Sequence, residues 1–412
     1  MKRVSAAVFP AALVWSAALA CVQPAQGAVG RGTEWSRVYP AALESVFLAA
    51  AAVPYGGAVL GGFRQDDTDA HGWPVVGDAW IVRIGADGEV AWEARLAGRK
   101  GDAVMALAGT SDGGFLVGGI TGSRDGDFAR EGGEKLAPWV AGLDVDGKTR
   151  WLRVLPGSGD SHPFMYALGE TPGGGVAALT VGDLPGPGNG CSGKGVVFWR
   201  ISANGADVSR ACPGLSFEPS LDYSWAVMPD GGAAAAYSDG GRARVALMSP
   251  EGKLVWDVDT GGDSASAVCP LPGGGLAVGG TGPGGRPRLF ALGPDGSLVW
   301  ESDLEDSGQG WIKTIAALPD GLFAAGDTPG AVEGTYNMMA VRTFPDGRVA
   351  WSAEAGGSGL EETAAATCLK DGGCVAVWAT LSRDGDLAVP GGEPAPEGGN
   401  GRYQAWALKF KP

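Results

Sequence analysis

The residues best suited to binding chemistry lie in two segments that repeat each other, 123–134 and 382–393. Nine of their twelve positions are identical, and both begin Ser-Arg-Asp-Gly-Asp. The two segments share acidic side chains at three positions of a Gly-rich loop, and these are Asp125, Asp127, Glu134, Asp384, Asp386 and Glu393. Calcium prefers carboxylate oxygens, so the pattern predicts two candidate calcium loops. The alternative is a turn-rich loop in which each Asp accepts hydrogen bonds from nearby backbone amides.

Two further motifs carry catalytic residue types without the structural context that the chemistry needs. Gly109–Gly113 has the Gly-x-Ser-x-Gly form of a hydrolase nucleophile, but it lies in a hairpin turn and not between a strand and a helix. Gly188–Lys194 begins like a phosphate-binding loop. Gly195 then replaces the Ser or Thr that would bind magnesium, and no helix follows. Both segments are therefore interpreted as turns or loops.

Histidines are too few for a histidine-based metal centre. The chain has two, His71 and His162, and it contains no Cys-x-x-Cys pair. This disfavours zinc and copper sites, which draw on these ligands. His71 follows Asp66, Asp67 and Asp69, a group that fits either a cation site or a solvated acidic loop.

The composition describes a folded, acidic protein. The 412 residues include 73 Gly and 27 Pro, close to the proportion found in disordered chains. However, 45% are hydrophobic, 15 are Trp and only 19% are charged, which is enough apolar material for a large core. The net charge of −15 repels phosphate backbones and excludes nucleic acid as the expected partner.

The first residues resemble an export signal. Lys2 and Arg3 precede an apolar stretch and small residues, and 1–27 is predicted to be a signal peptide removed before Ala28. No later stretch is long and apolar enough to predict a transmembrane helix. Cys21 lies in a sequence similar to a lipoprotein cleavage box, so a lipid anchor there is the alternative to simple export. The expected location is periplasmic, outer-membrane-associated or extracellular.

A Gly-rich turn between two apolar runs recurs seven times. These turns begin at Pro54, Ser111, Pro172, Pro229, Pro272, Pro319 and Lys370. A second turn of the Asp-Gly type alternates with the first, and its glycines are Gly88, Gly147, Gly205, Gly252, Gly296 and Gly347. Five of these six turns are followed by a Trp, whereas the turn at Gly205 has Ser209 instead. Both turn types indicate β-hairpins.

Two hairpins per unit make four strands, and four short strands per repeat of this length are typical of a β-propeller blade. The sequence predicts a single all-β domain over 28–412, a seven-bladed β-propeller. Its blades cover about 44–97, 103–155, 163–211, 222–260, 264–304, 311–355 and 362–411. The segment 33–39 matches a fourth strand, with Trp35 at the repeated Trp position. It is expected to complete the last blade and close the ring.

Cysteine spacing favours disulfides in an oxidising compartment. Cys368 and Cys374 flank a tight turn, and Cys191 and Cys212 lie within one repeat. Both pairs are predicted bridges, which leaves Cys269 as an odd thiol that is expected to be buried.

The same repeats resemble a family of exported bacterial β-propeller proteins. The match is carried by Ser111–Gly119, Asp78–Ile84 and Asp87–Trp92, and it covers nearly the whole chain after the leader. Similar propellers include the scaffold lipoprotein of the outer-membrane assembly machinery and the quinone-dependent alcohol dehydrogenases. The chain lacks the adjacent-cysteine pair of those dehydrogenases. The resemblance implies the fold and leaves the activity open.

Long insertions should share one face of the disc, because they all follow the second strand of a blade. They lie at 64–78, 122–138, 181–195, 327–337 and 381–402. This long-loop face is expected to be acidic and to bind a protein or glycan, which would make the protein a non-catalytic scaffold. The alternative is a lyase or glycosidase with carboxylates in the central funnel. Polar groups with perturbed pKa values that converge at the channel mouth would favour the enzyme.

Overall fold

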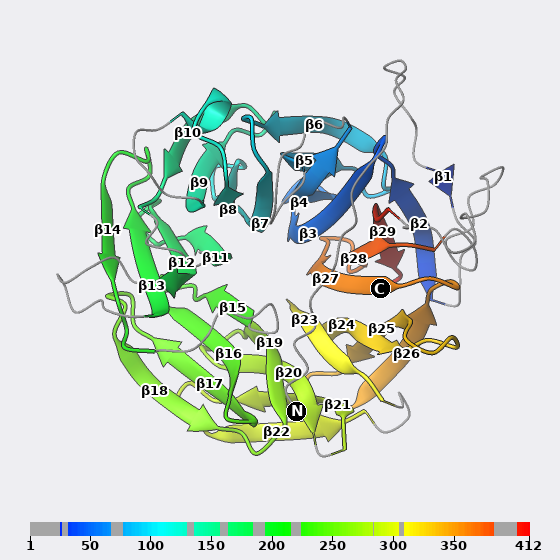
Figure 1. The fold of residues 1–412 in the computed structure, drawn as a ribbon. Helices are drawn as coiled ribbons and strands as arrows, with labels where there is room; N and C mark the ends of the chain where they lie inside the picture. Colours follow the sequence, from blue (N-terminus) through cyan, green and yellow to red (C-terminus); the bar gives the residue numbers. More distant parts are fainter. Residues whose placement is uncertain are drawn as a thin grey trace.

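Seven antiparallel sheets surround a central axis in the computed structural model (Figure 1). The structure describes residues 25–26, 32–66, 77–129, 136–156, 164–183, 194–215, 224–282, 284–304, 309–382 and 402–412. Over these ranges the one helix is a short 3-10 turn, η1 (Gly126–Phe128). The prediction of a seven-bladed all-β propeller is confirmed.

Each blade follows the order inner strand, second strand, third strand, outer strand. Blade one is β3 (Glu44–Ala52), β4 (Ala58–Gln65), β5 (Asp78–Ile84) and β6 (Val90–Leu96). Blade two is β7 (Asp102–Gly109), β8 (Phe115–Thr121), β9 (Ala137–Leu143) and β10 (Thr149–Val154). Blade three is β11 (Phe164–Glu170), β12 (Val176–Asp183), β13 (Lys194–Ile201) and β14 (Val208–Ala211). Blade four is β15 (Ser224–Val227), β16 (Ala233–Asp239), β17 (Arg242–Met248) and β18 (Leu254–Asp259).

Blade five is β19 (Ser264–Pro270), β20 (Leu276–Gly282), β21 (Arg286–Leu292) and β22 (Leu298–Asp303). Blade six is β23 (Trp311–Leu318), β24 (Gly321–Pro329), β25 (Tyr336–Thr343) and β26 (Val349–Ala355). Blade seven combines β27 (Glu361–Cys368), β28 (Cys374–Thr380) and β29 (Gln404–Phe410) with β2 (Thr33–Tyr39) and a two-residue strand, β1 (Ala25–Gln26).

The ring closes through β2, as the repeat pattern predicts. β2 pairs antiparallel with β29, so residues from the two ends of the sequence share one sheet (Figure 1). Trp406 Nε1 donates to Ser36 Oγ at 2.8 Å, and the buried Lys409 ammonium lies 2.7 Å from Asp371 and 3.1 Å from Glu34. Unlike the other six sheets, this one has a fifth strand, because β1 pairs with the outer edge of β2.

A β-bulge interrupts six of the seven inner strands within the described residues. Each bulge leaves one inner-strand residue without a partner on the second strand, and these residues are Leu48, Met105, Tyr166, Ser266, Lys313 and Ala364. The inner strands contact one another in sequence around the axis (Figure 1).

The Gly-Gly pairs of the second strands fit against these bulges. At Gly119 a β-carbon would lie 1.8 Å from the carbonyl oxygen of Ala103 on the inner strand. At Gly118 it would lie 2.4 Å from Leu168 of the next blade. One glycine therefore admits the bulged inner strand and the other admits the neighbouring blade.

In five blades the repeated Trp of the outer strand contacts the Asp-Gly turn of the following blade. Trp92 Nε1 donates to Val145 O at 3.2 Å, and a β-carbon at Gly147 would lie 2.8 Å from the Trp92 ring. Trp256 donates in the same way to Pro294 O at 2.9 Å, and Trp35 donates to Ala86 O at 2.8 Å. The Trp and the Asp-Gly turn are thus two halves of one contact between blades.

Blade three lacks this Trp and uses another donor. Ser209 stands at the Trp position, opposite Arg200 on β13. The Arg200 guanidinium donates to Pro250 O, the carbonyl that corresponds to Val145 O in blade two. An arginine on the third strand therefore supplies the bond that the Trp provides in blades one, four and seven.

Candidate binding surface at the channel mouth

The two matching segments begin at equivalent buried anchors. In blade two, Asp102 is fully buried and accepts hydrogen bonds from Thr121 Oγ1 (2.5 Å), Ser123 Oγ (2.9 Å) and the Gly98 amide (3.0 Å). Burial raises the pKa of Asp102 to about 6, although these hydrogen bonds act to lower it. The carboxylate therefore holds the start of the loop at Ser123.

Blade seven repeats this anchor with a longer acid. Glu361 is fully buried and accepts from Thr380 Oγ1 at 3.0 Å and from the Gly357 amide at 3.2 Å. Ser382 Oγ accepts from the Gly359 amide at 2.7 Å, and in blade two Ser123 Oγ accepts from the Lys100 amide in the same way. The sequence match between the loops thus continues into the blade that carries each of them.

Two of the six predicted calcium ligands lie in the described residues, and each bonds a backbone amide. Asp125 Oδ1 accepts from the Arg99 amide at 2.8 Å, and Asp127 Oδ2 accepts from the Ala97 amide at 2.9 Å. These bonds hold the start of the loop against the connection from blade one to blade two. The other four residues, Glu134, Asp384, Asp386 and Glu393, lie outside the described residues. Where the chain is described, no three acidic, His or Cys side chains form a group able to hold a metal.

Of the remaining chemistry motifs, the Gly-x-Ser-x-Gly segment lies in a hairpin turn, as its context predicts. Gly109–Gly113 forms the first hairpin turn of blade two, where the Ser111 hydroxyl donates to Glu170 of the next blade at 3.0 Å. His71, His162 and 188–193 lie outside the described residues.

The Cys368–Cys374 bridge is confirmed. Cys212 is disulfide-bonded, its predicted partner Cys191 lies outside the described residues, and Cys269 is a free thiol.

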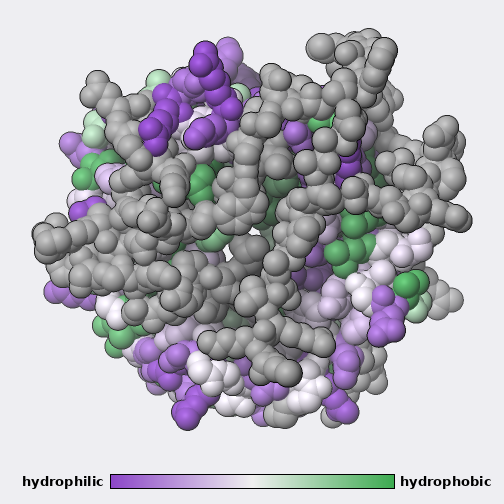
Figure 2. Space-filling view, in the orientation of Figure 1, coloured by the Kyte–Doolittle hydropathy of each residue, from purple (hydrophilic) through white to green (hydrophobic). Residues whose placement is uncertain are grey.

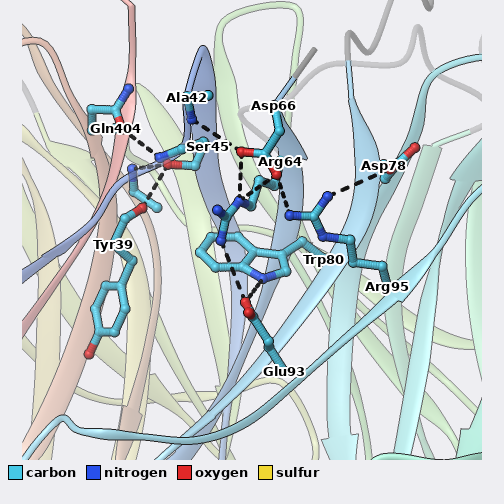
Figure 3. A network of polar contacts seen from close by, with 12 residues as sticks. Tyr39, Ala42, Ser45, Arg64, Asp66, Asp78, Trp80, Glu93, Arg95 and Gln404 are labelled. Atoms are coloured by element: carbon cyan, nitrogen blue, oxygen red, sulfur yellow. Dashed lines mark hydrogen bonds and ion pairs between the residues drawn. The ribbon is translucent and has the colours of Figure 1, made fainter. Parts of the chain in front are cut away.

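An ion-pair network holds both ends of the blade-one insertion (Figure 3). The Arg95 guanidinium pairs with Asp66 just before 67–76 and lies 4.0 Å from Asp78 just after it. Arg64 lies 3.0 Å from Asp66 and stacks over Trp80 at 5.3 Å. Burial would raise the pKa of Asp66, but hydrogen bonds from Arg95, the Ala42 amide and Arg64 hold it below its usual range. Asp66 is thus already engaged by two arginines.

An apolar cluster lies where the inner strands begin, at the mouth of the channel on the long-loop face. Its buried floor consists of Val46, Phe63, Ala103, Ile120 and Ala379. Four partly exposed side chains pack on this floor from blades one, two, three and seven, and they are Leu48, Met105, Phe164 and Tyr403. We refer to these four residues as the mouth cluster. Leu48 and Met105 are bulge residues, so the inner-strand bulges help to place apolar side chains at the mouth.

Glu44 adds a buried acid to this mouth. It is the first residue of β3 and is 8% exposed, and its Oε1 atom is buried without a hydrogen-bond partner. Burial raises its pKa to about 7, and the charge of Arg402 only partly offsets this. The acid therefore titrates near neutral pH.

Tyr403 connects Glu44 to a second acid. Its backbone oxygen accepts from the Ser45 amide at 3.1 Å, which fixes the residue beside Glu44. Burial raises the pKa of the Tyr403 phenol to about 12, with further contributions from the charges of Glu362 and Glu44. Glu362 is exposed and lies opposite Ala379 of the apolar floor.

The mouth cluster and Glu44 are absent from the sequence prediction. An acidic residue next to an apolar run usually marks the exposed end of a strand, and Glu44 precedes such a run. Its burial results from residues about 360 positions away, such as Gln404, which accepts from the Ala41 amide. The available signal was weak. The first strand of a blade begins at the long-loop face, so an acid at its first residue lies on that face, but nothing in the sequence shows that the acid is buried.

Hydrophilic side chains are prominent at the rim of the disc in Figure 2, and hydrophobic ones are visible both at the rim and nearer the axis. Among the described residues, no helix has the length and apolar character needed to cross a membrane.

Known proteins resemble the chain in fold. No protein-family model and no curated protein matches it. A chain in the crystal structure of a mitotic checkpoint complex is 13% identical, with 92% of this chain and 96% of that chain covered and a TM-score of 0.54. A protein of unknown function from Dyadobacter fermentans is 11% identical, with coverages of 93% and 100% and a TM-score of 0.50. The Dos1 propeller is 10% identical, with coverages of 90% and 93% and a TM-score of 0.46. The first two similarities concern the fold alone, because identities this low say nothing of function.

Proposed function

We propose that the protein is an exported, non-catalytic scaffold that binds a protein or glycan on its long-loop face. The observation that carries this proposal is the mouth cluster, in which four blades bring partly exposed apolar side chains together at one end of the channel. Apolar side chains gathered on one face of a rigid domain are typical of interaction sites. The contacts that hold the insertions of blades one, two and seven are made by Asp66, Asp102 and Thr380, which lie on the same strands as residues of the apolar floor or directly after them.

The test is a pull-down from the native cell envelope with variants on opposite faces. Glu362→Lys reverses a charge at the mouth without entering the core, and Met105→Glu places a charge inside the mouth cluster. Tyr55→Lys is the matched control, because Tyr55 is 72% exposed in a tight turn on the other face. Capture that the two mouth variants reduce and the control retains would support the proposal. Equal capture by all variants would contradict it.

Export belongs to the same proposal. The 1–27 segment would direct it, with release before Ala28 or a lipid on Cys21 as the two outcomes. N-terminal sequencing of the exported protein, together with a Cys21→Ala variant, distinguishes them. A lipid-anchored protein would leave the membrane fraction when Cys21 is replaced, whereas a cleaved protein would be unaffected.

A lyase or glycosidase acting at the mouth is the second candidate. Glu44 favours it, because a buried acid that titrates near neutral pH suits general acid chemistry. We expect an enzyme of this kind to degrade at least one polysaccharide in a panel of acidic and neutral glycans, and to lose about 100-fold or more of its rate in Glu44→Gln. No product from any glycan would favour the scaffold.

A further inference from the structure

Glu44 differs from the other acids that begin inner strands. Asp102 and Glu361 are fully buried, and Thr, Ser and backbone donors satisfy their oxygens. Among the described carboxylates, Glu44 is the one with a buried oxygen that lacks a hydrogen bond. A buried acceptor left in this state destabilises a fold, so a donor from outside the chain would find an energetic advantage here.

Among the described residues, one cation of the chain acts on Glu44, and no hydrogen bond or ion pair joins the two. Arg402 acts on Glu44 through its charge, but it is itself exposed. Glu362 and Tyr403 also lie at this mouth; the Glu362 carboxylate adds negative charge, and its raised pKa keeps the Tyr403 phenol neutral. The net charge of the whole chain is −15, so long-range attraction also favours a cation.

The mouth cluster supplies apolar surface near this acid, since Val46 of its floor is two residues from Glu44 on β3. Leu48, Met105 and Tyr403 are partly exposed and pack on one buried floor. A lysine or arginine side chain has an apolar stem and a charged tip, which matches apolar surface near a single carboxylate. A neutral glycan would require several polar partners, and a divalent metal would require several oxygen ligands.

From this juxtaposition we infer that the channel mouth binds a lysine or arginine side chain of a partner protein, with the cationic tip on Glu44 and the stem against the mouth cluster. The inference rests on the proposed scaffold function and narrows its partner to a protein segment in which a basic residue is flanked by apolar ones. Arg402 would compete with this side chain for Glu44.

The test is a titration of the full chain with two labelled peptides that have the same Leu-x-Leu core, followed by fluorescence polarisation. One carries lysine at x, and the other carries the uncharged, similarly sized norleucine. We expect the lysine peptide to bind wild type at least tenfold more tightly, and its affinity to rise severalfold from pH 6 to pH 8 as Glu44 loses its proton. In Glu44→Gln both the lysine preference and the pH dependence should disappear.

Two further variants make the result specific. Glu333→Gln removes a charge from an exposed residue of the blade-six insertion and should leave the preference intact. Arg402→Ala should leave it unchanged or increase it. Equal binding of both peptides to wild type, or a lysine preference that survives in Glu44→Gln, would overturn the inference. Unfolding of Glu44→Gln at pH 5 within 2 °C of wild type would show that the variant is folded.

The two proposals can fail separately. Partner capture that depends on the mouth but is unchanged in Glu44→Gln would retain the scaffold and reject the cation site. A lysine preference that depends on Glu44, without any partner captured at that face, would retain the site and reject the scaffold.

Discussion

The ring of Trp92 in blade one lies over Gly147 of blade two, so close that a β-carbon at Gly147 would come within 2.8 Å of it. Gly147 also has a φ of 81°, a conformation that side chains other than Gly rarely adopt. The same arrangement recurs between Trp300 and Gly347, where the distance would be 2.4 Å. The stability of the ring therefore depends on these glycines for two reasons: a side chain there would displace the Trp ring, and it would be strained by the positive φ.

Alanine substitutions can separate these two reasons. Gly147→Ala should lower the free energy of unfolding by about 3 kcal/mol or more, since it adds displacement of Trp92 to a backbone cost of about 1–2 kcal/mol. Gly56 also has a positive φ but has nothing within 4 Å, so Gly56→Ala should show the backbone cost alone. Gly173 has open space and no positive φ, and Gly173→Ala should change stability by less than about 0.5 kcal/mol. Urea unfolding measures all three, and equal losses in Gly147→Ala and Gly56→Ala would contradict the role of Trp92.

Arg200 should be as important to blade three as the Trp is to the others. Its guanidinium donates to Pro250 O and lies 5.4 Å from the centre of the Phe198 ring. Arg200→Met keeps the apolar stem and removes both interactions, so we expect a loss of about 1.5–3 kcal/mol in urea unfolding. Arg242→Met is the control, because Arg242 is 72% exposed and its ion pair with Asp259 should contribute below about 1 kcal/mol. Similar losses in the two variants would show that Arg200 does not replace the Trp.

Glu44 should make stability depend on pH in a direction set by its pKa. The folded-state pKa of about 7 lies above the usual 4.5, so the folded state binds more protons than the unfolded state between these values. Stability therefore falls as pH rises from about 5 to 8, by on the order of 2–3 kcal/mol. Glu44→Gln carries no proton and should escape this loss, becoming more stable than wild type at pH 8 and similar at pH 5. A constant difference between wild type and Glu44→Gln from pH 5 to 8 would contradict the raised pKa, and Glu333→Gln should show no pH-dependent difference.

Calcium binding by the matching loops stays a prediction. Calorimetric titration of the full chain should show heat with calcium that disappears in the Asp125→Ala/Asp384→Ala double variant. Thr121→Val is a useful comparison, because it removes a donor to Asp102 and loosens the loop anchor without changing a carboxylate of the loop. No heat at millimolar calcium would leave Asp125 and Asp127 with the backbone contacts seen here.

The fold was predictable because its signals are local and repeated. Gly231 and Gly252 both have positive φ values, and their turns can be recognised within five residues of sequence. Closure through β2 was equally predictable, since Trp35 occupies the repeated Trp position and thereby identifies β2 as an outer strand. A pattern that seven units share is visible even where one copy, such as that of Ser209, has changed.

The candidate site was less predictable because it depends on differences between the blades. The bulges at Leu48 and Met105 have no glycine or other local marker on the inner strand. The raised pKa of Glu44 depends on burial by neighbours from the opposite end of the sequence, including Tyr403. The role of Arg200 is likewise not marked by any repeated sequence pattern. It follows only from the folded structure, in which Arg200 donates to Pro250 O of the next blade.

Closure of the ring also sets the order in which the molecule can be completed. The bond from Trp406 to Ser36 joins residues 370 positions apart, whereas most contacts within a blade join near neighbours in sequence. Forming so distant a pairing is slow, because a very long loop must close before any contact stabilises it. Blades one to six contain all their own strands and can fold while the chain is still being made, but blade seven must wait for β29. Until then β2 has an open edge toward its missing neighbour, so a chain that stops before residue 404 would be prone to pair with other copies of itself.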